Sequence, residues 1–447
     1  MDTIFAPITS TNRSSIIVLR ISGSKSFDCL MHLGVKHNLE HRKSTLCNLR
    51  DEKNDEIIDQ ALVTFFDNPK SFTGEDVAEI ALHGSVFILN KVIEMLLELD
   101  QVRLAEAGEF SKRAFLNDKI DLVEAEAIVD LIESETKLQH NQAMRQFQGD
   151  LGKIYEDWRR ELIAICANIE AFIDFPDEDL PVDIVESLEA RVRTLIKQIQ
   201  LHLDDGKRGE KIRQGLSLAI IGKPNVGKSS LINYLAKSEV AIVSEIAGTT
   251  RDVIDVHLNI SGVPVVISDT AGIRDSDDEI EKEGIKRALE KAKNADLKIV
   301  VSDMNSPDDF DQELIDSETI LVINKTDLKR ECGGDVDFSR LGNLKIHHQP
   351  ILVSLKEKTN LDTLLEAIES KVESLNLPSA SPPITRARYR HSLVEMTNDL
   401  SHFSLNKNIE FAAEDLRLAI REIGKITGKI SVDDILDVVF SGFCIGK

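Results

Sequence analysis

The sequence is poor in cysteine and contains no long apolar run. Its cysteines number five, and they lack the paired spacing of a zinc or disulfide framework: Cys29, Cys47, Cys166, Cys332 and Cys444. No apolar stretch approaches the roughly 18 residues that would span a bilayer. The N-terminus lacks the basic-then-apolar order of a signal peptide. These absences predict a soluble, cytoplasmic protein in a reducing compartment, without a membrane partner.

Positive charge is also scarce. The net charge is −23, from 54 basic and 77 acidic residues, and such a field repels nucleic acid at long range. Any RNA contact must therefore be local or shared with a partner. The best local candidate is the cluster Arg386, Arg388, Arg390 and His391. A solvated helix face is the other interpretation of this cluster.

The chain length predicts more than one domain. A chain of 447 residues with 42% hydrophobic content exceeds what one core usually supports, so we expect two or three domains. Residues 1–118 mix short β-rich runs at 16–21, 61–66 and 77–82 with a helical pattern at 86–99. This mixture predicts an α+β first domain.

From Leu122 onward the apolar period becomes that of a helix. Leu122, Ala125, Val129 and Ile132 share one face, and similar stripes run through 162–173 and 184–199, with a break near 175–177. Cys166 lies on such a stripe, which indicates a small core residue. These patterns predict long amphipathic helices.

After a polar charged stretch at 204–214, strands and helices alternate. Apolar runs at 218–221, 263–267, 297–301, 320–323 and 351–353 predict buried strands of a largely parallel sheet. A Pro/Ser-rich linker at 378–383 follows, and helical spacing then resumes. The simplest architecture inserts an α/β domain into a discontinuous all-helical domain. The expected limits are 1–118 for the first domain, 119–212 and 378–447 for the helical halves, and 213–377 for the α/β domain.

Gly222-Lys223-Pro224-Asn225-Val226-Gly227-Lys228-Ser229 follows a predicted strand and opens a helix. That context predicts a phosphate loop rather than a glycine turn. Its backbone N–H groups turn towards a β-phosphate, Lys228 supplies a positive charge, and the Ser229 hydroxyl is a magnesium ligand.

Further motifs complete a nucleotide site. Asp269-Thr270-Ala271-Gly272 ends the next strand, where a carboxylate holds magnesium through water and a glycine N–H reaches the γ-phosphate. Thr249-Thr250 lies between these elements, where it can sense that phosphate. The order of these motifs along the chain predicts that the protein hydrolyses a nucleoside triphosphate.

Asn324-Lys325-Thr326-Asp327 selects the base. Asp327 can accept two hydrogen bonds from the N1 and N2 edge of guanine, which adenine lacks, and such unsatisfied polar groups give roughly 10⁴-fold discrimination. Ser354-Leu355-Lys356 would supply a backbone N–H to the guanine oxygen. The motifs together predict a P-loop (Ras-like) G domain that binds GTP.

The residue that orients the attacking water is less evident. Ile273 follows Gly272, where Ras-like enzymes carry glutamine. Glu281, Glu279, Asp278 and Arg274 lie within reach of this switch. Their segment is acidic enough to be solvated surface, which is the alternative interpretation.

Four segments carry a specific resemblance. They are Ser71–Asp76, Ala107–Asn117, Ile173–Pro176 and the terminal Phe443-Cys444-Ile445-Gly446-Lys447. With the G-domain motifs, their order and spacing resemble the MnmE (TrmE) family of tRNA-modification GTPases over essentially the whole chain. The resemblance implies an N-terminal folate-binding and dimerising domain, a discontinuous helical domain and an inserted G domain.

The resemblance also implies a function. Such proteins form homodimers and, in a heterotetramer with a flavin-dependent MnmG (GidA) type partner, add an aminomethyl or carboxymethylaminomethyl group to carbon 5 of the wobble uridine in certain tRNAs. A tetrahydrofolate derivative, in its 5-formyl or methylene form, is implicated as the one-carbon donor. GTP hydrolysis drives the conformational cycle.

The matching positions carry expected roles. Arg20, Glu79, Lys119 and Lys447 resemble the folate-contacting set, although relatives are glycine-rich where this chain has Thr9–Ser15. Glu281 resembles the catalytic glutamate. Cys444 is either active in chemistry or an incidental tail cysteine.

Two cations are implied as well. The potassium site of relatives corresponds to Asn225, Ser244, Ile246 and Thr249, and magnesium is expected on Ser229 and Thr250. The full GTP-binding prediction comprises Asn225, Val226, Gly227, Lys228, Ser229, Ser230, Ser244, Glu245, Ile246, Ala247, Gly248, Thr249, Thr250, Asp269, Thr270, Ala271, Gly272, Asn324, Lys325, Thr326, Asp327, Ser354, Leu355 and Lys356.

A regulatory GTPase of the ribosome-assembly type is the competing function. Such switches usually carry an RNA-binding domain and a basic surface, whereas this chain is acidic and ends in Phe-Cys-Ile-Gly-Lys. The modifying-enzyme interpretation is therefore favoured.

Overall fold

The computed structural model describes residues 2–36, 39–51, 53–174, 182–238, 240–242, 256–268, 290, 292–307, 310, 315–316, 319–328, 349–375, 381–405, 409–430, 436, 439–444 and 446. The chain divides into two compact units. One comprises Met1–Val129, Gln146–Ile196 and Ser392–Lys447, and the other comprises Asp130–Arg145 and Lys197–His391. No helix within these described ranges is long and apolar enough to cross a membrane.

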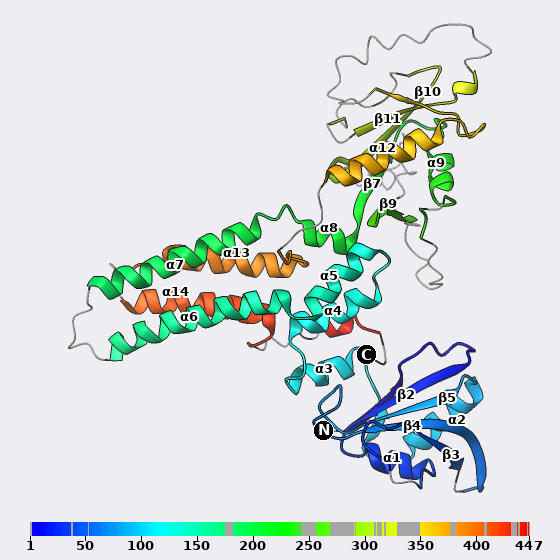
Figure 1. The fold of residues 1–447 in the computed structure, drawn as a ribbon, viewed down its shortest axis with the longest axis vertical. Helices are drawn as coiled ribbons and strands as arrows, with labels where there is room; N and C mark the ends of the chain where they lie inside the picture. Colours follow the sequence, from blue (N-terminus) through cyan, green and yellow to red (C-terminus); the bar gives the residue numbers. More distant parts are fainter. Residues whose placement is uncertain are drawn as a thin grey trace, which may run out of the picture. The chain divides into compact units, whose positions relative to one another are not determined.

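The first unit begins with a six-stranded sheet in the order β3-β4-β5-β2-β1-β6 (Figure 1). Neighbouring strands are antiparallel except β1 and β6, which are parallel. The elements are β1 (Thr3–Pro7), β2 (Ile16–Ser22), α1 (Ser26–His32), β3 (Thr45–Asp51), β4 (Glu56–Phe66), β5 (Val77–His83), α2 (Val86–Leu97) and β6 (Val102–Leu104). The predicted β-rich runs lie in β2, β4 and β5. Strands β1, β3 and β6 were not predicted.

The two faces of this sheet differ because side chains alternate along each strand. Leu19 and Ile21 of β2 point into an apolar core that also contains Leu30 of α1 and Val92 of α2. Arg20, between them, points to the opposite face. The sheet therefore packs one face against α1 and α2, while the other face carries Arg20 and Glu79 together with exposed Leu46 and Leu62.

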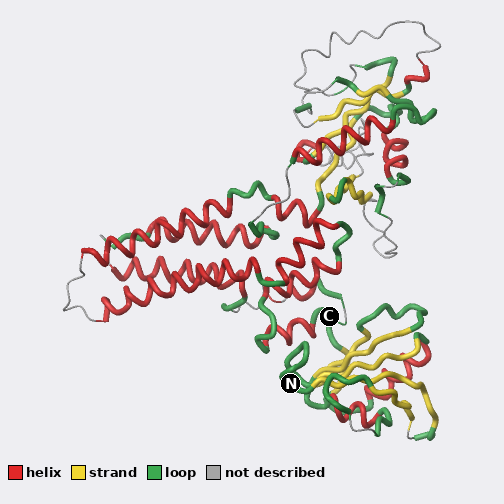
Figure 2. The backbone as a smooth tube through the Cα atoms, in the orientation of Figure 1, coloured by secondary structure: helices red, strands yellow, loops and turns green. Residues whose placement is uncertain are grey.

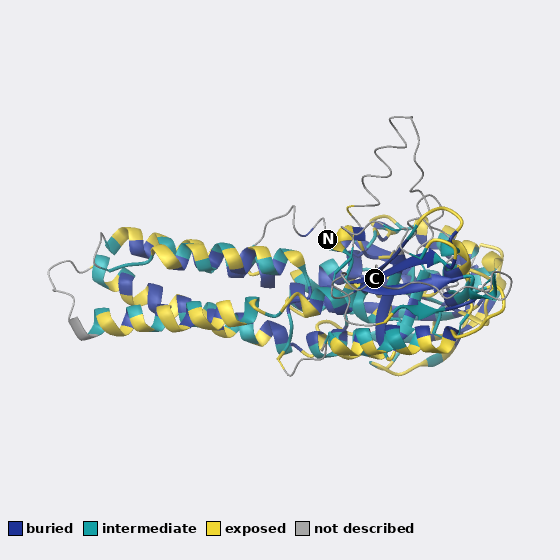
Figure 3. Ribbon diagram, turned by 90° about the horizontal axis from the view of Figure 1, so that it is seen from above, coloured by how far each residue is buried: buried dark blue, intermediate teal, exposed yellow. Residues whose placement is uncertain are grey.

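The helical elements are α3 (Glu109–Leu116), α4 (Leu122–Ile132), α5 (Lys137–Phe147), α6 (Asp150–Asp174), α7 (Val182–Leu203), α13 (Ala387–His402) and α14 (Ile409–Thr427). Helices α6 and α14 lie side by side although more than 200 residues separate them in sequence (Figures 1 and 2). Their inner faces are buried and their outer faces exposed (Figure 3). Cys166 on α6 is buried, as predicted, and burial raises the pKa of its thiol. The two sequence halves of the helical region thus pack together.

The second unit contains a sheet in the order β12-β11-β10-β7-β9-β8. All neighbours are parallel except β8 and β9. The elements are α8 (Arg208–Gln214), β7 (Leu216–Ile221), α9 (Lys228–Leu235), β8 (Val256–Ile260), β9 (Val263–Ser268), β10 (Leu297–Asp303), β11 (Thr319–Asn324), β12 (Ile351–Leu352) and α12 (Leu361–Ser374). The five predicted strands are present, and β8 is an additional one.

The polar stretch 204–214 and the Arg386 cluster both make internal contacts. The stretch 204–214 contains α8, because Ile212 is buried in the core of the second sheet. In the Arg386 cluster, Arg390 pairs with Asp205 at 2.7 Å and Glu210 at 2.9 Å, and Arg386 pairs with Asp130 at 2.8 Å. These two arginines are internal ion-pair partners, so they form neither a solvated helix face nor an open basic surface.

Candidate functional site

The phosphate loop joins β7 to α9, and two of its glycines are required by close packing. Gly222 has φ +154° and Gly227 has φ +111°. A Cβ at Gly222 would collide with the carbonyl oxygen of Val301, and one at Gly227 would collide with the amide of Asn324. Glycine is needed here both for its backbone conformation and for the approach of β10 and β11.

Lys228 opens α9 and turns its side chain back over the loop. Its Nζ donates hydrogen bonds to the carbonyl oxygens of Gly222 at 2.6 Å and Lys223 at 2.8 Å. The ammonium group and the first N–H groups of α9 therefore lie at one end of the helix, where an anion is stabilised. Asn225, with φ +63°, lies in the same loop, and Ser229 lies in the first turn of α9.

Asn324 links three loops at the carboxyl edge of the sheet. It ends β11 and is 4% exposed. Its Nδ2 donates to the carbonyl oxygen of Val226 at 2.8 Å, and its Oδ1 accepts from the backbone N–H of Leu355 at 3.1 Å. One buried amide thus joins the phosphate loop to the loop after β12.

Asp327 lies in a short 3₁₀ helix, Thr326–Leu328. Its Oδ1 accepts a hydrogen bond of 2.8 Å from the Ser354 hydroxyl, and Ser354 is fully buried. Beside it, Lys325 pairs with Asp303 at 3.0 Å. Burial is the largest influence on the pKa of Asp303 and raises it, but the hydrogen bond and charge of Lys325 and the backbone N–H groups of Asn305 and Ser306 together lower the pKa below its ordinary value. The Ser354 hydroxyl therefore orients the Asp327 carboxylate, which is expected to recognise a base.

The structure brings together three of the predicted nucleotide segments, Asn225–Ser230, Asn324–Asp327 and Ser354–Lys356. The other predicted positions lie outside the described residues. They are Ser244, Glu245, Ile246, Ala247, Gly248, Thr249, Thr250, Asp269, Thr270, Ala271, Gly272 and Glu281, and, from the folate set, Lys447.

In the first unit, Arg20 and Glu79 lie directly opposite each other on β2 and β5. Arg20 donates to Glu79 Oε1 from Nε at 2.9 Å and from Nη2 at 2.7 Å. The guanidinium carbon lies 5.1 Å from the ring centre of Phe72 and 5.6 Å from that of Phe110. Neither ring was singled out from sequence, although both lie in segments that carry the family resemblance. The result is a charged pair against an aromatic wall.

Lys119 and the C-terminal tail lie elsewhere on this unit. Lys119 Nζ donates to the Pro69 carbonyl oxygen at 2.8 Å, in the loop that continues to Phe72. The Cys444 carbonyl oxygen accepts from the N–H of Gly108 at 3.4 Å, and a Cβ on Gly446 would collide with the carbonyl oxygen of Pro7. The tail therefore reaches the end of β1, the strand that pairs with β2. The Cys444 side chain is exposed.

Lys119 also lines a cavity of about 210 Å³ with Asp121. Asp121 and Glu124 form a capping box at the start of α4, in which each side chain accepts from the other's backbone N–H at 2.8 and 2.7 Å. Burial raises the pKa of Asp121 to about 6. This buried carboxyl group and Lys119 line the same cavity.

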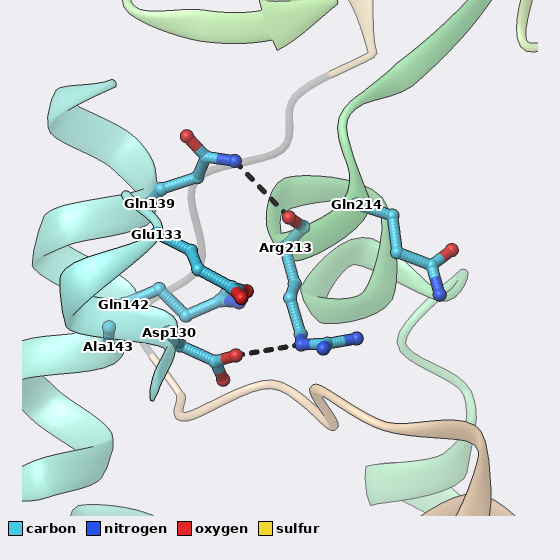
Figure 4. A pocket seen from close by; sticks show the side chains of 7 residues that line it. All are labelled: Asp130, Glu133, Gln139, Gln142, Ala143, Arg213 and Gln214. Atoms are coloured by element: carbon cyan, nitrogen blue, oxygen red, sulfur yellow. Dashed lines mark hydrogen bonds and ion pairs between the residues drawn. The ribbon is translucent and has the colours of Figure 1, made fainter. Parts of the chain in front are cut away.

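A second cavity, of about 200 Å³, lies between α8 and the segment that runs from the end of α4 into α5 (Figure 4). It is lined by Asp130, Glu133, Gln139, Gln142, Ala143, Arg213 and Gln214. Arg213 Nε lies 2.8 Å from Asp130 Oδ1, and Gln139 Nε2 donates to the Arg213 carbonyl oxygen at 3.2 Å. No sequence motif indicated this cavity.

The phosphate loop, the base loops after β11 and β12 and the strand order together define the class. A mostly parallel sheet that carries these loops at the carboxyl ends of its strands is a P-loop G domain, the fold of guanine-nucleotide-binding proteins. In this chain, the G domain accompanies an antiparallel-sheet domain and a helical domain.

Comparison with known proteins specifies the family. Residues 3–119 match the family described as GTP-binding protein TrmE N-terminus, and residues 122–444 match the MnmE helical domain. The chain is 46% identical over 452 residues to the tRNA modification GTPase MnmE of Rickettsia bellii (strain RML369-C), and this alignment covers 100% of both chains. The chain is also 46% identical over 450 residues to the tRNA modification GTPase MnmE of Orientia tsutsugamushi (strain Boryong). This alignment covers 100% of this chain and 99% of the relative. The chain belongs to the MnmE (TrmE) family.

Proposed function

We propose that this chain hydrolyses GTP and that the hydrolysis serves the modification of tRNA, the activity for which its relatives are named. The observation that carries the nucleotide part is the Asn324 amide, which joins the phosphate loop to the base loops at one edge of the sheet. Lys228 would offset phosphate charge, and Asp327, oriented by Ser354, would accept two hydrogen bonds from guanine. A backbone N–H of residues 354–356 would bind the guanine oxygen.

The finer reaction follows the family resemblance. With a flavin-dependent MnmG-type partner, the chain would add an aminomethyl or carboxymethylaminomethyl group to carbon 5 of wobble uridine in certain tRNAs. We propose a homodimer that forms a heterotetramer with this partner in the cytoplasm. The open face of the first sheet supports self-association, because Leu46 and Leu62 lie opposite each other there and are 55% and 48% exposed.

We propose that Glu281 orients the attacking water in the hydrolytic step, since the Ile273 side chain has no polar group that could do so. Magnesium would be held by Ser229 and Thr250. Potassium would be held by Asn225 with Ser244, Ile246 and Thr249, and would supply positive charge beside the phosphates. Among these positions, Asn225 and Ser229 lie in the described phosphate loop and the first turn of α9.

A folate fits the charged pair on the first sheet. Glu79 is 28% exposed and accepts hydrogen bonds, as the edge of a pterin requires, while Arg20 and Lys119 suit a glutamate tail. The Phe72 and Phe110 rings offer a flat apolar surface beside them. A bound tetrahydrofolate derivative would supply a one-carbon unit there. Lys447 and Cys444 are proposed as further members of this site.

The decisive experiment measures both halves of the proposal. Purified chain should hydrolyse GTP but not ATP, and mass spectrometry of tRNA from cells that lack the chain should reveal unmodified wobble uridine. GTP hydrolysis with unaltered wobble nucleosides would favour the ribosome-assembly switch. Absence of GTP hydrolysis, with or without the flavin partner, would overturn the nucleotide assignment.

A further inference from the structure

Arg113 lies on α3 and is buried, with only 5% of its side chain exposed. Its Nη1 donates to the backbone carbonyl oxygen of Asp2 at 2.8 Å and lies 3.1 and 3.3 Å from the two carboxylate oxygens of Glu75. Its Nη2 donates to Asp2 Oδ1 at 3.1 Å and to Glu109 Oε1 at 3.0 Å. One buried guanidinium group therefore joins the residue before β1, the loop between β4 and β5, and the first turn of α3.

The loop between β4 and β5 is held at two further points. Glu75 Oε2 accepts a hydrogen bond of 2.7 Å from the hydroxyl of Ser22, the last residue of β2. Ser22 follows Arg20 by two residues, so both lie on the same face of the strand. Asn117, directly after α3, donates from Nδ2 to the Thr73 carbonyl oxygen of the loop at 2.7 Å. The loop is therefore fastened both to β2 and to α3.

The loop and α3 carry the two aromatic rings that contact Arg20. Phe72 precedes Thr73 in the loop, and Phe110 lies in the first turn of α3. Both rings belong to one apolar cluster, in which Phe110 is fully buried and Phe72 is partly buried. The position of the loop relative to α3 therefore sets the distance between the Phe72 ring and the guanidinium group of Arg20, which is 5.1 Å.

We propose that Arg113 is a positioning residue for the candidate folate site. By joining the loop between β4 and β5 to α3, it holds the Phe72 ring against Arg20. The inference rests on the proposed folate site. An Arg20 side chain that is already fixed loses less conformational entropy when a ligand binds to it. Lysine cannot take the place of Arg113, because one ammonium nitrogen does not span the contacts that the guanidinium fork makes on both of its sides.

The test measures affinity for 5-formyltetrahydrofolate and for GTP by calorimetry in the full-length chain and its variants. Arg113→Lys should weaken folate binding about 10-fold and Asn117→Ala about threefold, with GTP affinity within about twofold of the parent. In a Phe72→Ala background, Arg113→Lys should cost less than about a further twofold, because the ring that the network positions is gone. The control, Lys91→Met, removes a 2.8 Å ion pair with buried Asp51 between α2 and β3, and should lower the unfolding midpoint without changing folate affinity.

Unchanged folate affinity in Arg113→Lys would overturn the inference, and the folate site itself would stand if Arg20→Ala still weakened binding. An undiminished 10-fold loss in the Phe72→Ala background, or an equal loss in Lys91→Met, would also overturn it, since the network would then act by another route or through general destabilisation. If Arg113→Lys does not fold, Asn117→Ala must weaken folate binding for the inference to survive. A parent chain that does not bind 5-formyltetrahydrofolate would instead remove the proposed folate site.

Discussion

The two candidate sites of this molecule are built in opposite ways. The nucleotide loops follow parallel strands whose side chains are buried, as in β11, where every residue is buried. Their chemistry comes from backbone groups and from residues just beyond the strand ends. The Arg20–Glu79 pair instead lies in the middle of an antiparallel sheet, on the face left uncovered by α1 and α2.

This difference determines how each site responds to substitution. A loop site depends on a few buried connections such as Asn324, so one change should affect the whole site. A sheet-face site is a set of side chains on an already stable surface, so a change there should affect its ligand and little else. The following substitutions test this contrast.

The largest effect is expected at Asp327. In Asp327→Asn the carboxamide offers an NH₂ where guanine also carries an amino donor, whereas xanthine has a carbonyl there. Preference should move from GTP towards xanthosine triphosphate by about 10³- to 10⁴-fold. Competition binding of the two nucleotides measures this change, and unchanged GTP affinity would show that Asp327 does not face the base.

Asn324→Ala should have the next largest effect. It leaves the carbonyl oxygen of Val226 and the N–H of Leu355 without their buried partner, at a cost of about 2–4 kcal/mol in the free energy of unfolding of the G domain. GTP affinity should fall by about 10²-fold, measured by calorimetry. Asn117→Ala, which removes a 2.7 Å hydrogen bond from the Asn117 side-chain amide to the Thr73 carbonyl oxygen in the first unit, is the matched control and should leave GTP affinity unchanged.

The sheet-face site should respond separately. The double variant Arg20→Ala, Lys119→Ala removes both proposed cationic contacts, so affinity for 5-formyltetrahydrofolate should fall by about 10- to 100-fold. GTP turnover should stay within about twofold of the parent. Arg50→Ala, which removes an exposed ion pair of 3.4 Å on the same sheet, is the control. Undiminished folate affinity in the double variant would remove the assignment.

The smallest effect concerns stability and pH at Asp121. Burial raises the folded-state pKa of Asp121 to about 6, above the ordinary aspartate value of 3.8, so the folded form binds the proton more tightly. The resulting stabilisation is present below pH 4 and is lost as the pH rises through 6. Asp121→Asn keeps the cap oxygen without the charge, so its stability relative to the parent should increase by on the order of 2 kcal/mol between pH 4 and pH 7.

Denaturant unfolding at a series of pH values measures this difference. The control is Asp118→Asn, which changes an exposed neighbour that lines the same cavity. A flat difference for Asp121→Asn would mean that the Asp121 carboxyl group has the same pKa in the folded and unfolded states.

Local sequence determined the nucleotide loops. The phosphate loop, with its glycines at 222 and 227, and the Asn324–Asp327 motif are each a contiguous segment that follows a strand. Their chemistry could therefore be predicted from the sequence before the fold was known. The five short apolar runs of the second unit could likewise be predicted as strands from local sequence alone. Strand β8 was missed because Val256-His257-Leu258-Asn259-Ile260 alternates apolar and polar residues, whereas the other strands of this sheet were identified as largely continuous apolar runs.

Only the tertiary structure decided which distant residues meet. The opposition of Arg20 and Glu79 depends on strand register, and a one-residue slip would turn either side chain to the buried face. The sequence showed Arg386 and Arg390 as a run of positive charge, whereas their carboxylate partners come from segments about 180 to 256 residues away. Composition and spacing report on neighbours in the chain, but ion pairs and sheet faces form between segments that the fold brings together.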